Sequence, residues 1–185
     1  MSKHRPQVDG RSLHVILVAD KVKGSNVEAI ARIISGFNGL GYGRLYSLIV
    51  FGLRAAPIVE AAQSTTEAAQ LYVELPVFPG RPEPVQGLVE AWKLARDYDL
   101  PGIEPVVILI WTAHVRPRIN MKIARTLYAS SGLRMATVLA RPSPPGWMKY
   151  AEPPGGYVSY RSNMNAARLA ERLVNMALGL REAAR

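Results

Sequence analysis

Four short apolar runs, separated by amphipathic segments, constrain the fold of this chain more than any other feature. They are residues 13–19 (LHVILVA), 45–52 (LYSLIVFG), 105–111 (PVVILIW) and 133–140 (LRMATVLA). Strands buried on both faces have such nearly continuous apolar sequences, typical of the centre of a parallel sheet. Segments between the runs carry apolar residues at helical spacing. The alternation predicts an α/β fold of three layers, with a mostly parallel sheet between helices.

A second strand-like run, residues 56–62 (APIVEAA), follows 45–52 almost at once. A parallel return needs a crossover of about a dozen residues or more, so these two runs are expected to be antiparallel neighbours. Pro57 favours an edge position, where a missing backbone donor is tolerated. With residues 157–160 (YVSY) as a further short strand, we expect six strands, one of them an antiparallel edge strand, and helices on both faces of the sheet.

The 185 residues suit one domain, expected at 13–182 behind a basic arm at 1–12. Residues 141–156 contain five prolines and three glycines, which predicts a long surface loop. No apolar run approaches the ~20 residues that span a bilayer, and the N-terminus lacks the apolar core of a signal peptide. We therefore expect a cytoplasmic protein with no membrane contact. The absence of cysteine excludes disulfides and thiolate metal sites.

Two helix starts are predicted from local signals. Ser25 or Asn26 can cap the helix that follows the first strand. Ser64 and Glu67 form a capping box for a helix over 64–74.

The net charge of +9 is unevenly distributed. Residues 105–151 carry seven basic and no acidic side chains, whereas residues 60–104 carry three basic and eight acidic ones. A local basic excess indicates an anionic partner, which is either nucleic acid or an acidic protein surface. An ordinary solvated surface is the third interpretation.

Binding sites of open α/β folds lie at the carboxyl ends of the strands, which here means the loops at 20–26, 78–84 and 112–118. These loops contain five cations: Lys21, Lys23, Arg81, Arg116 and Arg118. The cations can pair with Asp20 and Glu83 as a salt-bridged plug, or form a docking face for acidic groups, or have no partner at all.

Enzymatic chemistry has little support in the sequence. His114 is the only histidine in a candidate site loop, and a lone loop histidine is usually a surface residue. The glycine-rich phosphate-loop and dinucleotide-binding motifs are both absent. We therefore expect a protein that is not an enzyme.

The order of the segments resembles the von Willebrand factor A (vWA) domain. Residues 14–20 (HVILVAD) are similar to the first strand of that family, and 48–52 (LIVFG) leading into 56–62 to its hairpin. Residues 81–91 (RPEPVQGLVEA) resemble the segment that brings its threonine ligand into the second site loop, and 106–113 (VVILIWTA) its fourth strand. The resemblance covers about 13–180 and implies a Rossmann-like three-layer fold with a six-stranded sheet.

The metal-ion-dependent adhesion site of that family uses an Asp-x-Ser-x-Ser loop, a threonine and a second aspartate. Of these, only Asp20 is retained: Val22 and Gly24 occupy the serine positions, and Glu83 and Ala113 occupy the other two. Magnesium requires hard oxygen ligands. The match therefore implies a degenerate site with no metal cofactor, and a shifted magnesium site at Asp20, Ser25 and Glu83 is the alternative.

The resemblance implies a protein-interaction module, which could belong to a larger assembly. The partner is expected to be a protein with an acidic surface, docking on the loop face at the carboxyl ends of the strands. The expected contact residues are Asp20, Lys23, Ser25, Glu83, Thr112, His114 and Arg116.

A different class of function remains open, that of an RNA-binding or ribosome-associated protein. The basic block would then contact phosphates while an aromatic side chain stacks on bases. The residues expected to make these contacts are Arg118, Lys122, Arg125, Trp147 and Lys149.

Overall fold

Six strands form one sheet in the order β3-β2-β1-β4-β5-β6. The computed structural model of the chain describes residues 12–40, 44–112, 132–139 and 156–179. The strands are β1 (Ser12–Asp20), β2 (Arg44–Phe51), β3 (Ala55–Ala62), β4 (Ile103–Trp111), β5 (Arg134–Leu139) and β6 (Tyr157–Ser159). The β2–β3 pair is antiparallel and the other neighbours are parallel, which confirms the predicted sheet with its antiparallel edge strand.

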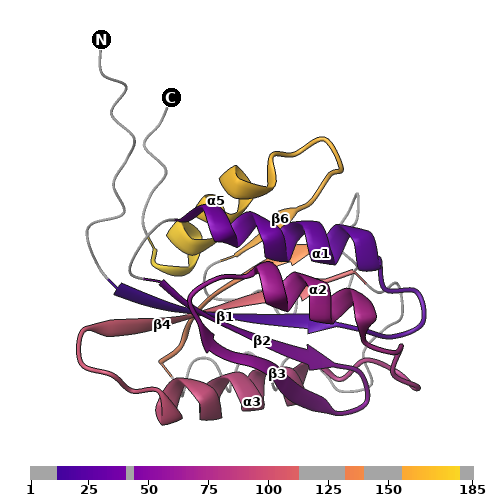
Figure 1. Ribbon diagram of the computed structural model, residues 1–185, viewed down its shortest axis with the longest axis horizontal. Coiled ribbons are helices and arrows are strands. Elements are labelled where there is room, and N and C mark those ends of the chain that lie inside the picture. The colour runs from indigo at the N-terminus through magenta and orange to yellow at the C-terminus, as the bar shows by residue number, and fades with distance from the viewer. Residues whose placement is uncertain (1–11, 41–43, 113–131, 140–155, 180–185) are drawn as a thin grey trace.

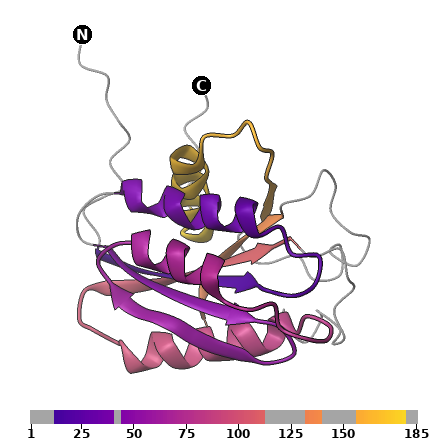
Figure 2. The ribbon, with the colours of Figure 1, turned by 45° about the vertical axis from the view of Figure 1, so that its right-hand side comes forward.

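Helices cover both faces of the sheet, as Figures 1 and 2 show. Helices α1 (Val27–Gly36), α2 (Thr66–Glu74) and α5 (Ala166–Ala177) lie on one face, and α3 (Pro84–Asp97) lies on the other. A short 3₁₀ helix, η1 (Phe37–Leu40), extends α1. The predicted three-layer α/β fold is confirmed.

Alternate side chains of the central strand β1 build the two halves of the core. Val15 and Leu17 pack in the half that contains α1, α2 and α5, while Ile16 and Val18 pack in the half that contains α3. All four side chains are fully buried. A strand with one face in water would alternate apolar and polar residues, so the nearly continuous apolar sequence of β1 follows from its burial on both faces.

One predicted helix start is confirmed and another is wrong. Asn26 caps α1, because its side-chain oxygen accepts a hydrogen bond from the Ala29 N–H at 3.0 Å. Helix α2 has Thr65 at its N-cap position without a side-chain capping bond. A capping box needs its acidic residue at the third helical position, but Glu67 is the second residue of α2, so Ser64 and Glu67 do not form one.

Several predicted segments lie outside the described residues, namely the basic arm up to residue 11, most of the proline-rich loop at 141–156, and most of the segment between the apolar runs 105–111 and 133–140. The domain limits therefore stay a prediction. In the described ranges, no helix has the length and apolar character needed to cross a membrane.

Candidate functional site

Asp20 is the last residue of β1, at the point where the strand order reverses between β1 and β4. Its neighbour across the β1–β2 ladder is Phe51, and Thr112 follows directly after the end of β4. Asp20 and Thr112 therefore meet at the carboxyl edge of the sheet, where α/β folds place their binding crevices. Both are buried, with Asp20 0% and Thr112 1% exposed.

The carboxylate of Asp20 accepts hydrogen bonds at both of its oxygens. Oδ1 accepts the Thr112 backbone N–H at 2.7 Å, and Oδ2 accepts the Ser25 hydroxyl at 2.5 Å. The Thr112 Oγ1 lies 3.1 Å from Oδ2 and 3.3 Å from Oδ1, so the Thr112 hydroxyl donates there too. One main-chain and two side-chain donors thus surround a single carboxylate, an arrangement we call the Asp20 clamp.

The two hydroxyls of the Asp20 clamp are held in turn by the backbone of the β1–α1 loop. The Val22 N–H donates to Ser25 Oγ at 2.8 Å, and the Asn26 N–H donates to Thr112 Oγ1 at 2.9 Å. Each hydroxyl accepts a backbone bond and donates its own proton to the carboxylate. The clamp therefore fastens the β1–α1 loop to the end of β4.

Burial raises the pKa of Asp20 above its usual value, because the charged form is deprived of water. The hydrogen bonds from Ser25 and Thr112 act in the opposite direction, since they favour the carboxylate. Their effect on the pKa is smaller than that of burial.

Lys21 is buried although the sequence places it among the loop cations. Its side chain is 2% exposed and reaches the C-terminal end of α2, where Nζ donates to the Tyr72 carbonyl at 2.8 Å and lies 3.4 Å from the Val73 carbonyl. The Nζ also lies 4.5 Å from the centroid of the Tyr72 ring. A cation is favoured at a helix C-terminus because the last carbonyls have no partner within the helix.

Tyr72 connects the same helix to the Asp20 clamp. Its hydroxyl donates to the Asp20 backbone carbonyl at 2.6 Å. Burial lowers the pKa of Lys21 and raises the pKa of Tyr72, as expected for ionisable groups removed from water. Helix α2 therefore holds the backbone of Asp20 and the side chain of Lys21, while Thr112 holds the carboxylate of Asp20.

Among the described residues, Lys21 does not take the part that a salt-bridged plug would give it. Pairing of Asp20 with Arg116 or Arg118 stays a prediction, because both arginines lie outside the described ranges. The Asp20 carboxylate is held by hydroxyls and a backbone N–H, and Lys21 points instead to α2. The physical reason is geometric: successive residues of an extended strand point to opposite sides, so Asp20 and Lys21 face different layers.

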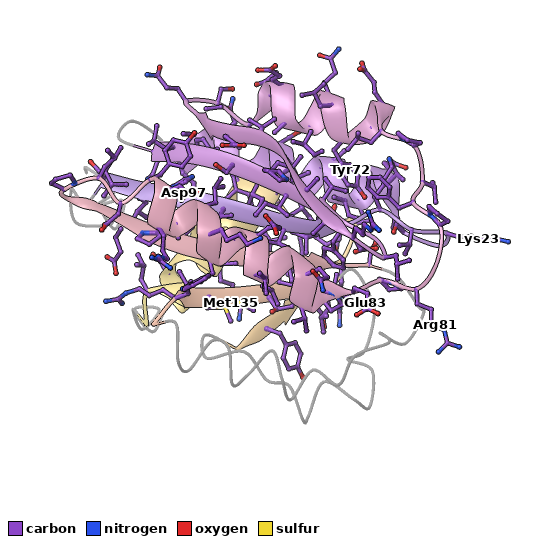
Figure 3. All side chains as sticks on the ribbon, turned by 90° about the horizontal axis from the view of Figure 1, so that it is seen from below. Lys23, Tyr72, Arg81, Glu83, Asp97 and Met135 are labelled. Atoms are coloured by element: carbon purple, nitrogen blue, oxygen red, sulfur yellow. The ribbon has the colours of Figure 1, made fainter. Side chains whose placement is uncertain are left out.

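The remaining predicted site residues fall into three groups. Lys23 and Arg81 are exposed and project from the same end of the molecule in Figure 3. Glu83 is 4% exposed, immediately before α3, and its N–H donates to the Gly52 carbonyl at 2.7 Å. The residues that lie outside the described ranges are His114, Arg116, Arg118, Lys122, Arg125, Trp147 and Lys149.

The hydrogen bonds around Asp20 disfavour a magnesium ion there, because an ion would have to compete with them for the same oxygens. Both carboxylate oxygens already accept hydrogen bonds, and the hydroxyl oxygens of Ser25 and Thr112 accept backbone N–H groups. Val22 and Gly24 offer no side-chain oxygen. The part of the chain that the structure describes contains no group of three or more His, Asp or Glu side chains able to hold a metal.

Sequence reasoning identified Asp20, Ser25 and Thr112 but missed how they connect. The bond from Thr112 to Asp20 spans 92 residues, and only the pairing of β1 with β4 brings the two together. The sequence did offer one signal, since Asp20 and Thr112 each directly follow an apolar run. No local signal distinguishes buried Lys21 from exposed Lys23.

Comparison with known proteins identifies the fold. The sequence matches no protein-family model and no curated protein. Among solved structures, an aerotolerance-related membrane protein from Bacteroides fragilis is similar with a TM-score of 0.67 and 11% identity, covering 91% of this chain and 100% of that one. The conserved hypothetical protein BatB from Bacteroides thetaiotaomicron has a TM-score of 0.65 and 15% identity, with coverages of 90% and 99%.

The SpRpn10 VWA domain is similar with a TM-score of 0.63 and 10% identity, over 88% of this chain and 95% of that one. Proximal thread matrix protein 1 from the mussel byssus, described with a zinc-occupied MIDAS motif, has a TM-score of 0.63 and 13% identity, over 90% of this chain and 46% of that one. The chain has the fold of a von Willebrand factor A domain, as its segment order predicted.

Proposed function

We propose that this chain is a non-enzymatic protein-interaction module of vWA type that binds its partner without a bridging metal. The docking surface is the loop face, formed by the β1–α1 loop (21–26), the β2–β3 turn (52–54) and the loop before α3 (75–83). The Asp20 clamp lies beneath this surface and fixes its shape. The fold supports the proposal, since a vWA fold suggests an interaction module.

One observation carries the metal-free part of the proposal: both oxygens of the Asp20 carboxylate already accept hydrogen bonds from Ser25 and Thr112. A metal-bridged partner needs open ligand positions on a cation held by oxygens. At Asp20 those oxygens are already used to join β1, the β1–α1 loop and β4. The clamp therefore replaces a metal in holding the loops together.

The charge of the exposed loop face favours an acidic partner. Lys23, Arg54 and Arg81 are exposed on it, whereas the acidic side chains Asp20 and Glu83 are buried. Complementary charge speeds encounter and suppresses wrong partners more than it adds affinity. A partner with a carboxylate-rich surface, within a larger assembly or as a single protein, fits this face.

Site-specific photo-crosslinking in cells of the source organism tests the proposal. A photoreactive residue is placed at Lys23 or Arg81 on the loop face, and as a control at exposed Asp97, which lies at the opposite end in Figure 3. We expect one protein to be crosslinked from Lys23 and Arg81 but not from Asp97, with equal yield in a lysate treated with EDTA. Crosslinking from Asp97 alone, or loss of the Lys23 and Arg81 crosslinks with EDTA, would contradict the proposal.

A further inference from the structure

Two exposed aliphatic side chains lie on the loop face beside the β2–β3 turn. Leu53 is 45% and Val77 is 54% exposed. Only five large apolar side chains are exposed in the described part of the chain, so finding two on one small surface sets that surface apart. Exposed apolar side chains that gather at one place mark interaction sites more often than single ones do.

Backbone contacts bring the chain segments that carry Leu53 and Val77 close to each other. The Phe78 N–H donates to the Lys21 carbonyl at 2.8 Å, and Phe78 packs so closely on Gly52 that a Cβ atom built there would lie 2.5 Å from the Phe78 Cβ. Leu53 follows Gly52 and Val77 precedes Phe78 in the chain. Leu53 and Val77 are therefore each adjacent in the chain to one residue of the contacting pair Gly52–Phe78.

The loop before α3 also passes close to Leu53. A Cβ atom built on Gly80 would lie 3.5 Å from the Leu53 Cβ, and the Glu83 N–H donates to the Gly52 carbonyl at 2.7 Å. Pro76 and Pro79 are exposed on the same loop. Proline restricts the backbone, so this surface loses little conformational entropy on binding.

Cations flank the aliphatic side chains. Arg54 follows Leu53 in the turn, Arg81 follows Gly80, and both are exposed. Glu74 is the exposed acidic residue closest along the chain, and it accepts a hydrogen bond from the Gln70 amide at 3.1 Å. The surface thus combines an apolar centre with a positive border.

From these contacts we infer that the hairpin rim, defined as Leu53, Arg54, Val77 and Arg81, is where the partner binds, and that it takes a short acidic segment with aliphatic side chains. This inference rests on the proposed docking at the loop face and adds the position and the chemistry. Aliphatic side chains of the segment cover Leu53 and Val77 while its carboxylates pair with Arg54 and Arg81. Arginine presents a planar fork of donors that matches a carboxylate.

Nuclear magnetic resonance titration of the ¹⁵N-labelled full chain tests the inference with three short synthetic peptides. One alternates glutamate and leucine, the second glutamate and serine, and the third lysine and leucine. We expect the glutamate–leucine peptide to shift the amides of Leu53, Arg54, Val77 and Arg81. The other two peptides are expected to bind at least about tenfold more weakly, since each lacks one of the two contacts.

Leu53→Ser and Leu100→Ser form a matched pair of variants, because each leucine is 45% exposed and Leu100 lies in the α3–β4 connection. Loss of the leucine surface that the peptide covers is expected to weaken binding of the glutamate–leucine peptide by about tenfold in Leu53→Ser. Leu100→Ser is expected to leave its affinity unchanged. Amide spectra of both variants serve as the check that they are folded.

Several outcomes overturn the inference. Amide shifts around Lys23 and Ser25 that persist in the Leu53→Ser variant would rule out the hairpin rim as the binding site. They would remain consistent with docking at the loop face. Shifts confined to Asp97 and Leu100 would contradict both the rim and the proposed function. Equal binding of the lysine–leucine peptide, binding of single-stranded RNA at the rim in its place, or no shift with any peptide would each overturn the rim alone.

Discussion

The carboxylate of Asp20 is buried at the end of β1, where hydroxyl and backbone N–H donors hold it. A buried acceptor that loses its donor costs about 1–3 kcal/mol, more than the net value of the hydrogen bond itself. The stability of the protein is therefore expected to depend on each donor of the Asp20 clamp.

Replacement of Thr112 by valine tests this dependence. Thr112→Val removes the hydroxyl that bonds Asp20 and accepts the Asn26 N–H, so we expect the free energy of unfolding to fall by about 1–3 kcal/mol. Thr137→Val is the matched control. Thr137 is also 1% exposed, but its hydroxyl has no hydrogen-bond partner among the described residues. Urea unfolding of both variants measures the difference, and equal losses would argue against the clamp.

The raised pKa of Asp20 predicts a particular pH dependence. The folded protein keeps the Asp20 proton at pH values where the unfolded chain, with a pKa near 3.8, has lost it. The contribution of Asp20 to stability is therefore fully present below pH 3.8 and is lost as the pH rises through the folded pKa.

Asp20→Asn removes this titration, so we expect the variant to gain stability relative to the wild type as the pH rises from acid toward neutral. Unfolding of the two proteins by urea over a pH series gives the difference, in which contributions of other groups cancel. A difference that falls with rising pH would show that the pKa of Asp20 is lowered instead.

His14 is a second buried titratable group, on the α3 side of the sheet. Its Nε2 lies 2.7 Å from the Ser47 hydroxyl, its ring contacts Tyr98 edge-on, and the Tyr98 hydroxyl donates to Glu60 at 3.2 Å. Burial lowers the pKa of His14 from 6.5 to about 4. The unfolded chain therefore binds a proton between these values that the folded protein does not, and stability falls as the pH falls through this window.

We expect the ring protons of His14 to titrate near pH 4 in nuclear magnetic resonance spectra. The loss of stability from this group between pH 6.5 and pH 4 is expected to reach about 3 kcal/mol. Titration of His14 near 6.5 would contradict the burial of an uncharged ring.

Among the elements, α1 and α5 approach so closely at one point that only a glycine fits between them. Gly36, at the end of α1, faces the Ala166 carbonyl at the start of α5, and a Cβ atom built on Gly36 would lie 2.4 Å from that oxygen. Gly39 in η1 is more open, since its built Cβ would lie 3.4 Å from the Ala167 Cβ. The close packing of α5 on α1 therefore depends on Gly36.

Gly36→Ala is expected to lower the free energy of unfolding by about 1–3 kcal/mol, because the backbone of α5 must move. Gly39→Ala is the control, with an expected change well below that of Gly36→Ala. Thermal unfolding compares the two variants. Equal melting temperatures would mean that α1 and α5 do not pack as described.

The elements themselves were largely predictable from the sequence, and their contacts were not. Apolar runs such as 105–111 predicted strands because double burial leaves little room for polar residues. The start of α2 was misplaced because Ser64, Thr65 and Thr66 offer equivalent capping side chains. The burial of Lys21 depends on where the end of α2 lies, which is a tertiary property that no local pattern encodes.

Some cations of the molecule lie on residues that the structure describes, and others lie outside those residues. The exposed cations of the described loop face are Lys23, Arg54 and Arg81. Most of the basic block at 105–151 lies outside the described residues, so binding of nucleic acid by Arg118, Lys122, Arg125, Trp147 and Lys149 stays a prediction. The proposal of an acidic protein partner rests on the three described cations instead.

We propose that the Asp20 clamp takes the place of a metal in the docking site. Calorimetric titration of the purified chain with magnesium and then manganese chloride tests this proposal. We expect no binding heat with either ion, because the oxygens of Asp20, Ser25 and Thr112 are already hydrogen-bonded. Micromolar binding of either ion by the wild type that is abolished in Asp20→Ala would contradict a metal-free docking site.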